Sequence, residues 1–134
     1  MQDDYRADVA VIGAGIMGTA IVTRLIETGH KVSVFDLDTE KVAALQAKGA
    51  RPAGSVEEAV SRSAFCVLSL NHASIVRAVV FGEKGVVAAA NADKLLIDMS
   101  SIDPADTADM AMRLRRETGM AWVDCPLSGG VPGA

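Results

Sequence analysis

The sequence predicts a doubly wound α/β fold, in which a mostly parallel sheet carries helices on both of its faces. Two observations support this prediction. Short apolar runs, rich in β-branched residues, alternate with helical patterns from one end of the chain to the other. These runs are nearly continuous in apolar character, which is typical of parallel strands buried on both faces. The 134 residues fit one domain, because domains most often contain about 100–150 residues.

Strand and helix patterns follow each other in a regular order. The six predicted strands are Asp8–Gly13, Lys31–Asp36, Ala50–Ala53, Ala64–Leu70, Lys94–Met99 and Ala121–Cys125. After the first strand, apolar residues recur at helical spacing from Gly18, and Gly29 can end that helix. The next helix is predicted to begin near Asp38 and to end at Gly49.

Two later helices have recognisable starts. Ser55 and Glu58 form a predicted capping box, in which the hydroxyl and the carboxylate accept each other's free backbone N–H groups. Asp103 is predicted to cap a helix that has Pro104 at its first position. The residues of that helix expected to face inward are Met110, Ala111 and Leu114.

Composition and charge exclude several classes of protein. Apolar residues form 50% of the chain, whereas disordered chains are poor in Val, Ile and Leu. No apolar run reaches the roughly 18 residues of a membrane span, and the acidic N-terminus is unlike a secretory signal. The net charge of −4, without a basic cluster, argues against nucleic acid as a partner. We therefore expect a soluble, cytoplasmic protein that is not attached to a membrane.

The two cysteines give no indication of a metal site. Cys66 and Cys125 have neither CxxC spacing nor a nearby pair of histidines. Each lies in or at the end of an apolar, strand-like run. We expect both to be buried, reduced thiols.

The strongest functional signal is the segment Val9–Gly18, which places a GxGxxG pattern between a strand and an amphipathic helix. Gly13 permits the tight turn after the strand, Gly15 has no side chain to keep a pyrophosphate from the backbone, and Gly18 lets the helix pack closely. The helix N-terminus then offers free N–H groups to the phosphates. The pattern predicts a dinucleotide site, and the alternative is a glycine-rich connection without a ligand.

An acidic residue, Asp36, ends the second predicted strand. Its carboxylate can accept hydrogen bonds from both hydroxyls of the adenosine ribose, and its charge would repel a 2′-phosphate. No arginine follows it, so NAD is favoured over NADP. The alternatives are a solvated carboxylate or a helix cap, a role that Asp38 can equally fill.

Three polar turns are predicted at the same edge of the sheet as the glycine turn, because each follows a parallel strand. They are Leu70–His72, Ser100–Ser101 and Pro126–Gly130. His72 is expected to be a loop or helix-start residue rather than a base, and His30 is expected to be structural.

Together these segments resemble the N-terminal, cofactor-binding Rossmann domain of the β-hydroxyacid dehydrogenases, the family of 3-hydroxyisobutyrate, tartronate semialdehyde and 6-phosphogluconate dehydrogenases. The motifs that carry the resemblance are Gly13–Gly18, Asp98–Pro104 and Asp124–Gly130, and the likeness extends over nearly the whole chain. The most specific of them is Asp124–Gly130, because that family uses Asp-x-Pro-x-Ser-Gly-Gly to bind its substrate.

The resemblance implies a set of binding residues. Leu70, Asn71 and Ser101 would line the nicotinamide side of the cofactor, and the full set for NAD is Gly13, Ala14, Gly15, Ile16, Met17, Gly18, Asp36, Leu70, Asn71 and Ser101. The Ser128 hydroxyl and the N–H groups of Gly129 and Gly130 would hold the carboxylate of a small 3-hydroxy acid.

The chain departs from the family pattern at Ala14, where leucine is usual, at Arg24, where asparagine is frequent, and at Asn71, where proline is common. The family's catalytic lysine and its asparagine partner follow the Ser-Gly-Gly motif and lead into an all-helical second domain. We therefore expect no catalytic residue within this chain, and we expect the lysine and the second domain to lie beyond Ala134.

The resemblance thus implies that residues 1–134 form the dinucleotide-binding domain of an NAD-dependent 3-hydroxyacid dehydrogenase. By itself this segment would bind NAD without turnover, because the acid/base group is missing. Apolar surface left by the absent domain would favour homo-oligomers. The alternatives are a non-catalytic dinucleotide-binding module, an imine-reductase-like enzyme that uses NAD(P)H, and, with less support, a flavoprotein.

Overall fold

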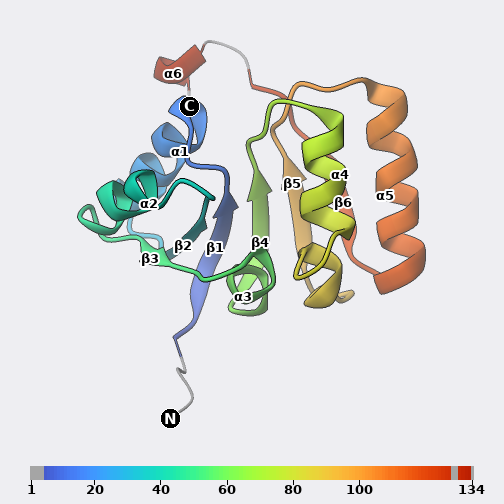
Figure 1. The fold of residues 1–134 in the computed structure, drawn as a ribbon, viewed down its shortest axis with the longest axis horizontal. Helices are drawn as coiled ribbons and strands as arrows, with labels where there is room; N and C mark the ends of the chain where they lie inside the picture. Colours follow the sequence, from blue (N-terminus) through green and yellow to red (C-terminus); the bar gives the residue numbers. More distant parts are fainter. Residues whose placement is uncertain (1–4, 128–129, 134) are drawn as a thin grey trace.

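The computed structural model describes residues 5–127 and 130–133, which contain a six-stranded parallel sheet (Figure 1). The strand order is β3-β2-β1-β4-β5-β6, so the chain crosses from one half of the sheet to the other between β3 and β4. The strands are β1 (Ala7–Ile12), β2 (Val32–Phe35), β3 (Arg51–Pro52), β4 (Ser63–Leu68), β5 (Leu95–Asp98) and β6 (Ala121–Asp124). All neighbouring pairs are parallel, as the near-continuous apolar runs predict.

Helices lie against both faces of the sheet, and successive strand residues point to these two faces in turn. The helices are α1 (Ile16–Glu27), α2 (Thr39–Gln46), α3 (Val56–Ser61), α4 (Ala73–Phe81), the 3₁₀ turn η1 (Val86–Ala88), α5 (Pro104–Thr118) and α6 (Gly130–Gly133). One apolar cluster joins α1 and α2 to β1 and β2 through residues such as Val22 and Val34. The other joins α3, α4 and α5 to β4 and β5 through residues such as Leu68 and Leu114. The predicted doubly wound architecture is therefore confirmed.

The predicted helix starts are largely confirmed. Asp38 and Asp103 each accept a hydrogen bond from the backbone N–H two residues later, so they cap α2 and α5. Ser55 caps α3 by accepting from the Glu58 N–H at 3.1 Å. The predicted return bond of the capping box is wrong by one residue, because the Glu58 carboxylate accepts from the N–H of Gly54 and not from that of Ser55.

Helix α4 was not predicted from the sequence. Its segment is rich in β-branched residues, which favour strands. Burial decides the outcome: Val76 and Val80, four residues apart, are both completely buried against the sheet. His72, expected to be a loop or helix-start residue, is the residue before α4, and its side chain makes no capping bond.

One of the two cysteine expectations is wrong. Cys66 is buried in β4 as predicted, and burial raises the pKa of its thiol to about 12. Cys125 is exposed. It follows the last residue of β6, which is an edge strand, so no further strand in the described part of the chain covers it.

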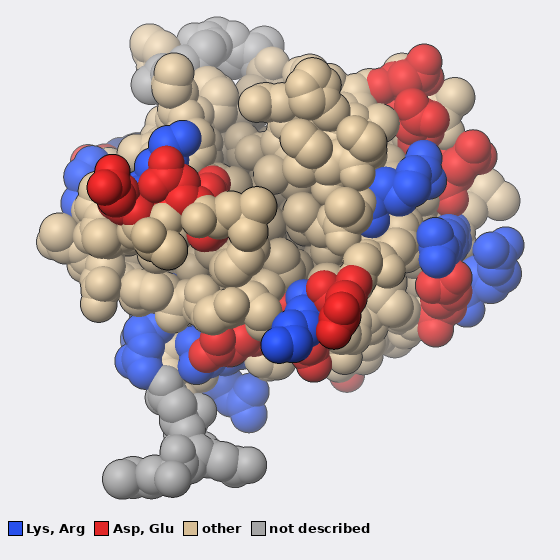
Figure 2. Space-filling model, viewed as in Figure 1, with Lys and Arg blue, Asp and Glu red and all other residues tan. Residues whose placement is uncertain are grey.

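The surface carries charges of both signs. Figure 2 shows Lys and Arg intermixed with Asp and Glu around the face that it presents, without a continuous patch of one sign. Across the described residues, no helix combines the length and the apolar character needed to cross a bilayer. The same residues hold no cluster of three or more His, Cys, Asp or Glu side chains suited to a metal ion.

Candidate cofactor site

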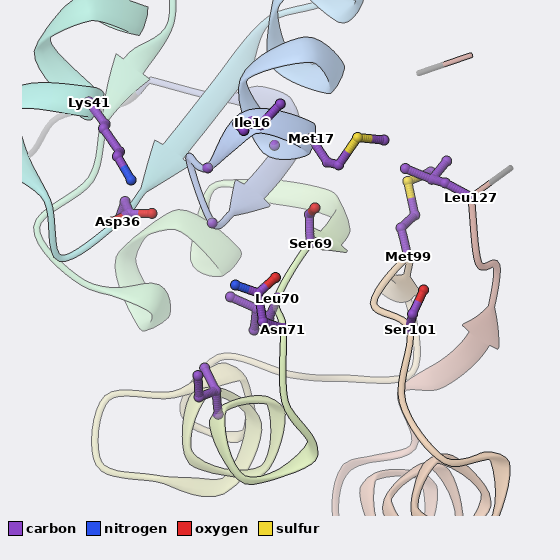
Figure 3. Close-up of a pocket in the computed structure, with 14 residues that line it drawn as sticks. Ile16, Met17, Asp36, Lys41, Ser69, Leu70, Asn71, Met99, Ser101 and Leu127 are labelled. Atoms are coloured by element: carbon purple, nitrogen blue, oxygen red, sulfur yellow. The ribbon is translucent and has the colours of Figure 1, made fainter. Parts of the chain in front are cut away.

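A pocket of about 650 Å³ lies at the carboxyl edge of the sheet, where the turns after β1, β2, β4, β5 and β6 meet (Figure 3). The glycine turn after β1 and the start of α1 form one wall. The turn after β4 contributes Ser69, Leu70 and Asn71, and the turn after β5 contributes Met99 and Ser101. Parallel strands bring these turns together although they are far apart in the sequence.

The three glycines of the first turn differ in what the protein requires of them. Gly13 has a φ of +106°, and a Cβ there would lie 2.4 Å from the Ser69 carbonyl oxygen. A Cβ on Gly18 would lie 1.8 Å from the Gly13 oxygen. Both positions must therefore be glycine for the chain to fold as it does.

Gly15 is different, because a Cβ added there would meet no described atom within 4 Å. Its backbone is extended, with φ −70° and ψ −164°, a conformation open to any residue. Folding therefore does not require glycine at this position. The open space beside it belongs to the pocket, so a side chain here would occupy the space of a ligand.

The N-terminus of α1 faces this open space without a side-chain cap. Gly15 occupies the N-cap position, where Ser, Thr, Asp or Asn would ordinarily accept a backbone N–H. The first turn of α1 contains no acidic residue either. The first N–H groups and the positive end of the helix dipole are consequently available to an anion in the pocket.

Asp36 connects the end of β2 to the glycine turn. Its Oδ2 atom accepts a hydrogen bond from the Ala14 N–H at 2.6 Å, and its Oδ1 atom accepts one from the Asp38 N–H at 2.8 Å. Asp38, rather than Asp36, is the cap of α2, so the alternative of a helix cap at Asp36 does not hold. Asp36 lines the pocket, and Figure 3 shows Lys41 extending toward it from α2.

On the opposite wall, a buried carboxyl group underlies the turn after β5. Asp98 is completely buried, and its Oδ1 atom accepts from the Ser100 N–H at 2.9 Å. Burial raises the pKa of Asp98, the neighbouring charge of Asp124 adds to that shift, and hydrogen bonds from Ser100 oppose it. The Ser100 hydroxyl in turn accepts from the Leu70 N–H at 2.9 Å.

Nine of the ten residues predicted for the cofactor line this one pocket, and Ala14 is the exception. Ala14 is buried and takes part through its backbone N–H, which donates to Asp36. Of the predicted substrate residues, Gly130 is the first residue of α6, whereas Ser128 and Gly129 lie outside the described residues.

Sequence reasoning missed several residues of the wall. Ile75 belongs to the unpredicted helix α4. Lys41 lies in the first turn of α2, where only the spacing from Asp36 indicates its place. Met99 and Leu127 lie within two of the motifs that carry the resemblance, so membership of those motifs was the signal that could have indicated them.

Residues 8–134 match the family described as the NAD-binding domain of 6-phosphogluconate dehydrogenase. The 3-sulfolactaldehyde reductase of Escherichia coli (strain K12) is 36% identical over 121 residues, which are 90% of this chain and 40% of that protein. The chain thus spans about two-fifths of the length of the curated relatives it matches.

Three solved structures are similar in fold. Psf3 in complex with NADP⁺ and 2-OPP has a TM-score of 0.87 and 27% identity, covering 94% of this chain and 44% of that chain. The 3-hydroxyisobutyrate dehydrogenase of Mycobacterium tuberculosis with L-serine has a TM-score of 0.85 and 30% identity, covering 96% and 43%. An imine reductase variant from Myxococcus stipitatus with NAD⁺ has a TM-score of 0.74 and 26% identity, covering 87% and 39%.

Proposed function

Since the chain belongs to the family of the NAD-binding domain of 6-phosphogluconate dehydrogenase, we propose that it is the cofactor-binding part of an NAD-dependent 3-hydroxyacid dehydrogenase. The whole protein would exchange a hydride between a small 3-hydroxy acid and NAD. Residues 1–134 would form one dinucleotide-binding domain. The similarity to 3-sulfolactaldehyde reductase and to 3-hydroxyisobutyrate dehydrogenase supports this class of substrate.

The observation that carries the proposal is the open space at Gly15 beside the uncapped N-terminus of α1. A pyrophosphate placed there would accept backbone N–H groups from Ile16, Met17 and Gly18 and would meet the positive end of the helix dipole. No side chain of the glycine turn would obstruct its approach.

Asp36 would recognise the ribose of the adenosine half. Each of its oxygens already accepts one backbone N–H, and each retains a second lone pair for a ribose hydroxyl. This arrangement fixes the carboxylate in the pocket. We propose that its negative charge makes the site prefer NAD to NADP.

The remaining turns would orient the reactive half of the cofactor and the substrate. Figure 3 shows Leu70 and Asn71 between Asp36 and Ser101, and these three pocket residues from the turns after β4 and β5, Leu70, Asn71 and Ser101, would border the nicotinamide. NAD, when bound, supplies the hydride acceptor or donor. We propose that Ser128, Gly129 and Gly130 hold the substrate carboxylate, and that a lysine following Ala134 in the whole protein moves the hydroxyl proton.

Two properties of the whole protein complete the proposal. We propose that it works in the cytoplasm and assembles into homo-oligomers. Phe65 and Val123, which are 44% and 45% exposed on the sheet, support the second statement, because large exposed apolar side chains favour contacts with a further protein surface.

A second candidate is an imine-reductase-like enzyme, favoured by the similarity to the reductase from Myxococcus stipitatus. The two candidates share the cofactor site and differ in substrate. The whole protein should therefore be assayed at 340 nm with a panel of 3-hydroxy acids and, separately, with cyclic imines and NAD(P)H. Oxidation of a hydroxy acid supports the first candidate, and imine reduction alone supports the second.

The chain of residues 1–134 tests whether NAD binding and proton transfer belong to different parts of the whole protein. It should bind NAD in calorimetry yet oxidise no 3-hydroxy acid at a useful rate, because a positioned acid/base contributes about 10²–10⁴-fold to such a reaction. Turnover of about 1–10³ per second by this segment would show that its own residues suffice for catalysis, and would contradict the proposed role of a lysine following Ala134.

A further inference from the structure

Two buried polar residues behind the pocket form a chain of hydrogen bonds between β4 and β5. Asp98 ends β5 and accepts the Ser100 N–H, while Ser100, only 3% exposed, accepts the Leu70 N–H. The second bond joins residues 30 positions apart in the sequence. It therefore fixes the turn after β4 relative to the turn after β5.

The turn after β4 is in close contact with the glycine turn as well. The Ser69 N–H donates to the Ile12 carbonyl at 3.1 Å, and the Ser69 oxygen occupies the place that a side chain on Gly13 would need. The position of this turn is thus set from two sides. Contact with the glycine turn holds Ser69, and the Ser100 hydroxyl holds Leu70.

Neither Asp98 nor Ser100 lines the pocket, whereas the residues next to them do. Met99 and Ser101 alternate with them along the chain and face the pocket, as do Leu70 and Asn71 on the adjacent turn. The polar pair therefore lies directly behind the wall that we assign to the nicotinamide half of the cofactor.

We propose that Asp98 and Ser100 are positioning residues, which hold the wall formed by Leu70, Asn71 and Ser101 in the arrangement that receives the nicotinamide half of NAD. This inference rests on the proposed function of the pocket. It predicts that loss of the Ser100 hydroxyl weakens NAD more than ADP-ribose, because ADP-ribose has the adenosine and pyrophosphate but lacks the nicotinamide.

The test compares Ser100→Ala with wild type by calorimetric titration of NAD and of ADP-ribose, with the melting temperature measured alongside. Ser33→Ala is the matched control, because Ser33 is buried like Ser100 but its hydroxyl has no hydrogen-bond partner in the described part of the chain. Loss of one neutral hydrogen bond changes an equilibrium by about 2- to 12-fold. We expect the affinity of Ser100→Ala for NAD to fall by this factor, and its affinity for ADP-ribose to fall by less than about half as much. Ser33→Ala should bind both ligands as tightly as wild type.

If Ser100→Ala does not fold, Ser100→Thr and Ser100→Val form the second pair, since these side chains have nearly the same shape and differ in the hydroxyl. Thr should then bind NAD more tightly than Val, with similar affinities for ADP-ribose. Unchanged NAD affinity, or equal weakening of both ligands, would overturn the positioning role while leaving the proposed function in place. Failure of wild type to bind NAD would overturn both.

Discussion

Replacing Gly15 with valine separates the demands of folding from those of ligand binding. A Cβ at Gly15 meets no described atom within 4 Å, and the extended backbone there suits a β-branched residue. The free energy of unfolding should therefore change by less than about 1 kcal/mol, since glycine replaced at a compatible site shifts stability only by that order. The chain should fold normally.

Binding should respond very differently to Gly15→Val. The valine methyl groups would keep the pyrophosphate away from the first N–H groups of α1, and hydrogen bonds to a charged group contribute about 1.5–3 kcal/mol each. Loss of two of them removes about 3–6 kcal/mol, which corresponds to about 10²–10⁴-fold in affinity. Calorimetric titration with NAD measures the loss, and circular dichroism and urea denaturation measure the fold.

Gly18→Ala is the contrasting variant, because its Cβ would lie 1.8 Å from the Gly13 oxygen. It should lose stability, by at least the roughly 1–3 kcal/mol that overpacking costs. A Gly15→Val protein that folds and binds NAD as tightly as wild type would refute the reasoning about the phosphate site. A Gly15→Val protein that is strongly destabilised would refute the statement that the fold leaves room for a side chain at this position.

Three further predictions concern other residues. Asp36→Ala combined with Leu37→Arg should weaken NAD and strengthen NADP in fluorescence titration, because a repulsive charge is lost and a phosphate partner is gained; a wild type that already prefers NADP would contradict the ribose assignment. The raised pKa of Asp98 means that the folded state binds its proton more tightly than the unfolded state, so stability falls as pH rises above 3.8 and through the folded pKa. Urea denaturation across pH should show that the free energy of unfolding of Asp98→Asn lacks this part of the decline. Parallel curves of that free energy against pH for wild type and Asp98→Asn would refute the raised pKa. A thiol reagent should modify Cys125 in the native protein and reach Cys66 only after denaturation, since Cys125 is exposed whereas Cys66 is buried with its pKa raised to about 12; rapid modification of both would contradict the buried position of Cys66.

The fold was predictable because its determinants are local and mutually consistent. Apolar runs of strand length, the caps Asp38 and Asp103, and the glycine turn each carry their signal within a few residues. Helix α4 was missed because its β-branched residues favour a strand, and only burial of Val76 and Val80 against a distant part of the chain makes it a helix.

The site was predictable where position in the fold determines role. Parallel strands guarantee that the turns after β1, β4 and β5 meet, so Gly15, Leu70 and Ser101 were expected on one pocket and lie there. Contacts across the pocket were not predictable. Neither the bond from Ala14 to Asp36 nor the bond from Leu70 to Ser100 has a signal in the sequence, because the order of the strands brings the turns together without specifying which polar atoms pair.

The most direct test of the account is a two-dimensional amide NMR titration of this chain with NAD. If the pyrophosphate lies at the uncapped start of α1, the largest shifts should occur at Gly15, Ile16 and Met17, with smaller ones at Asp36 and Leu70. Amides at the opposite edge of the sheet, such as that of Lys94, should not move. Absence of shifts in a folded chain, or shifts confined to that opposite edge, would contradict the account.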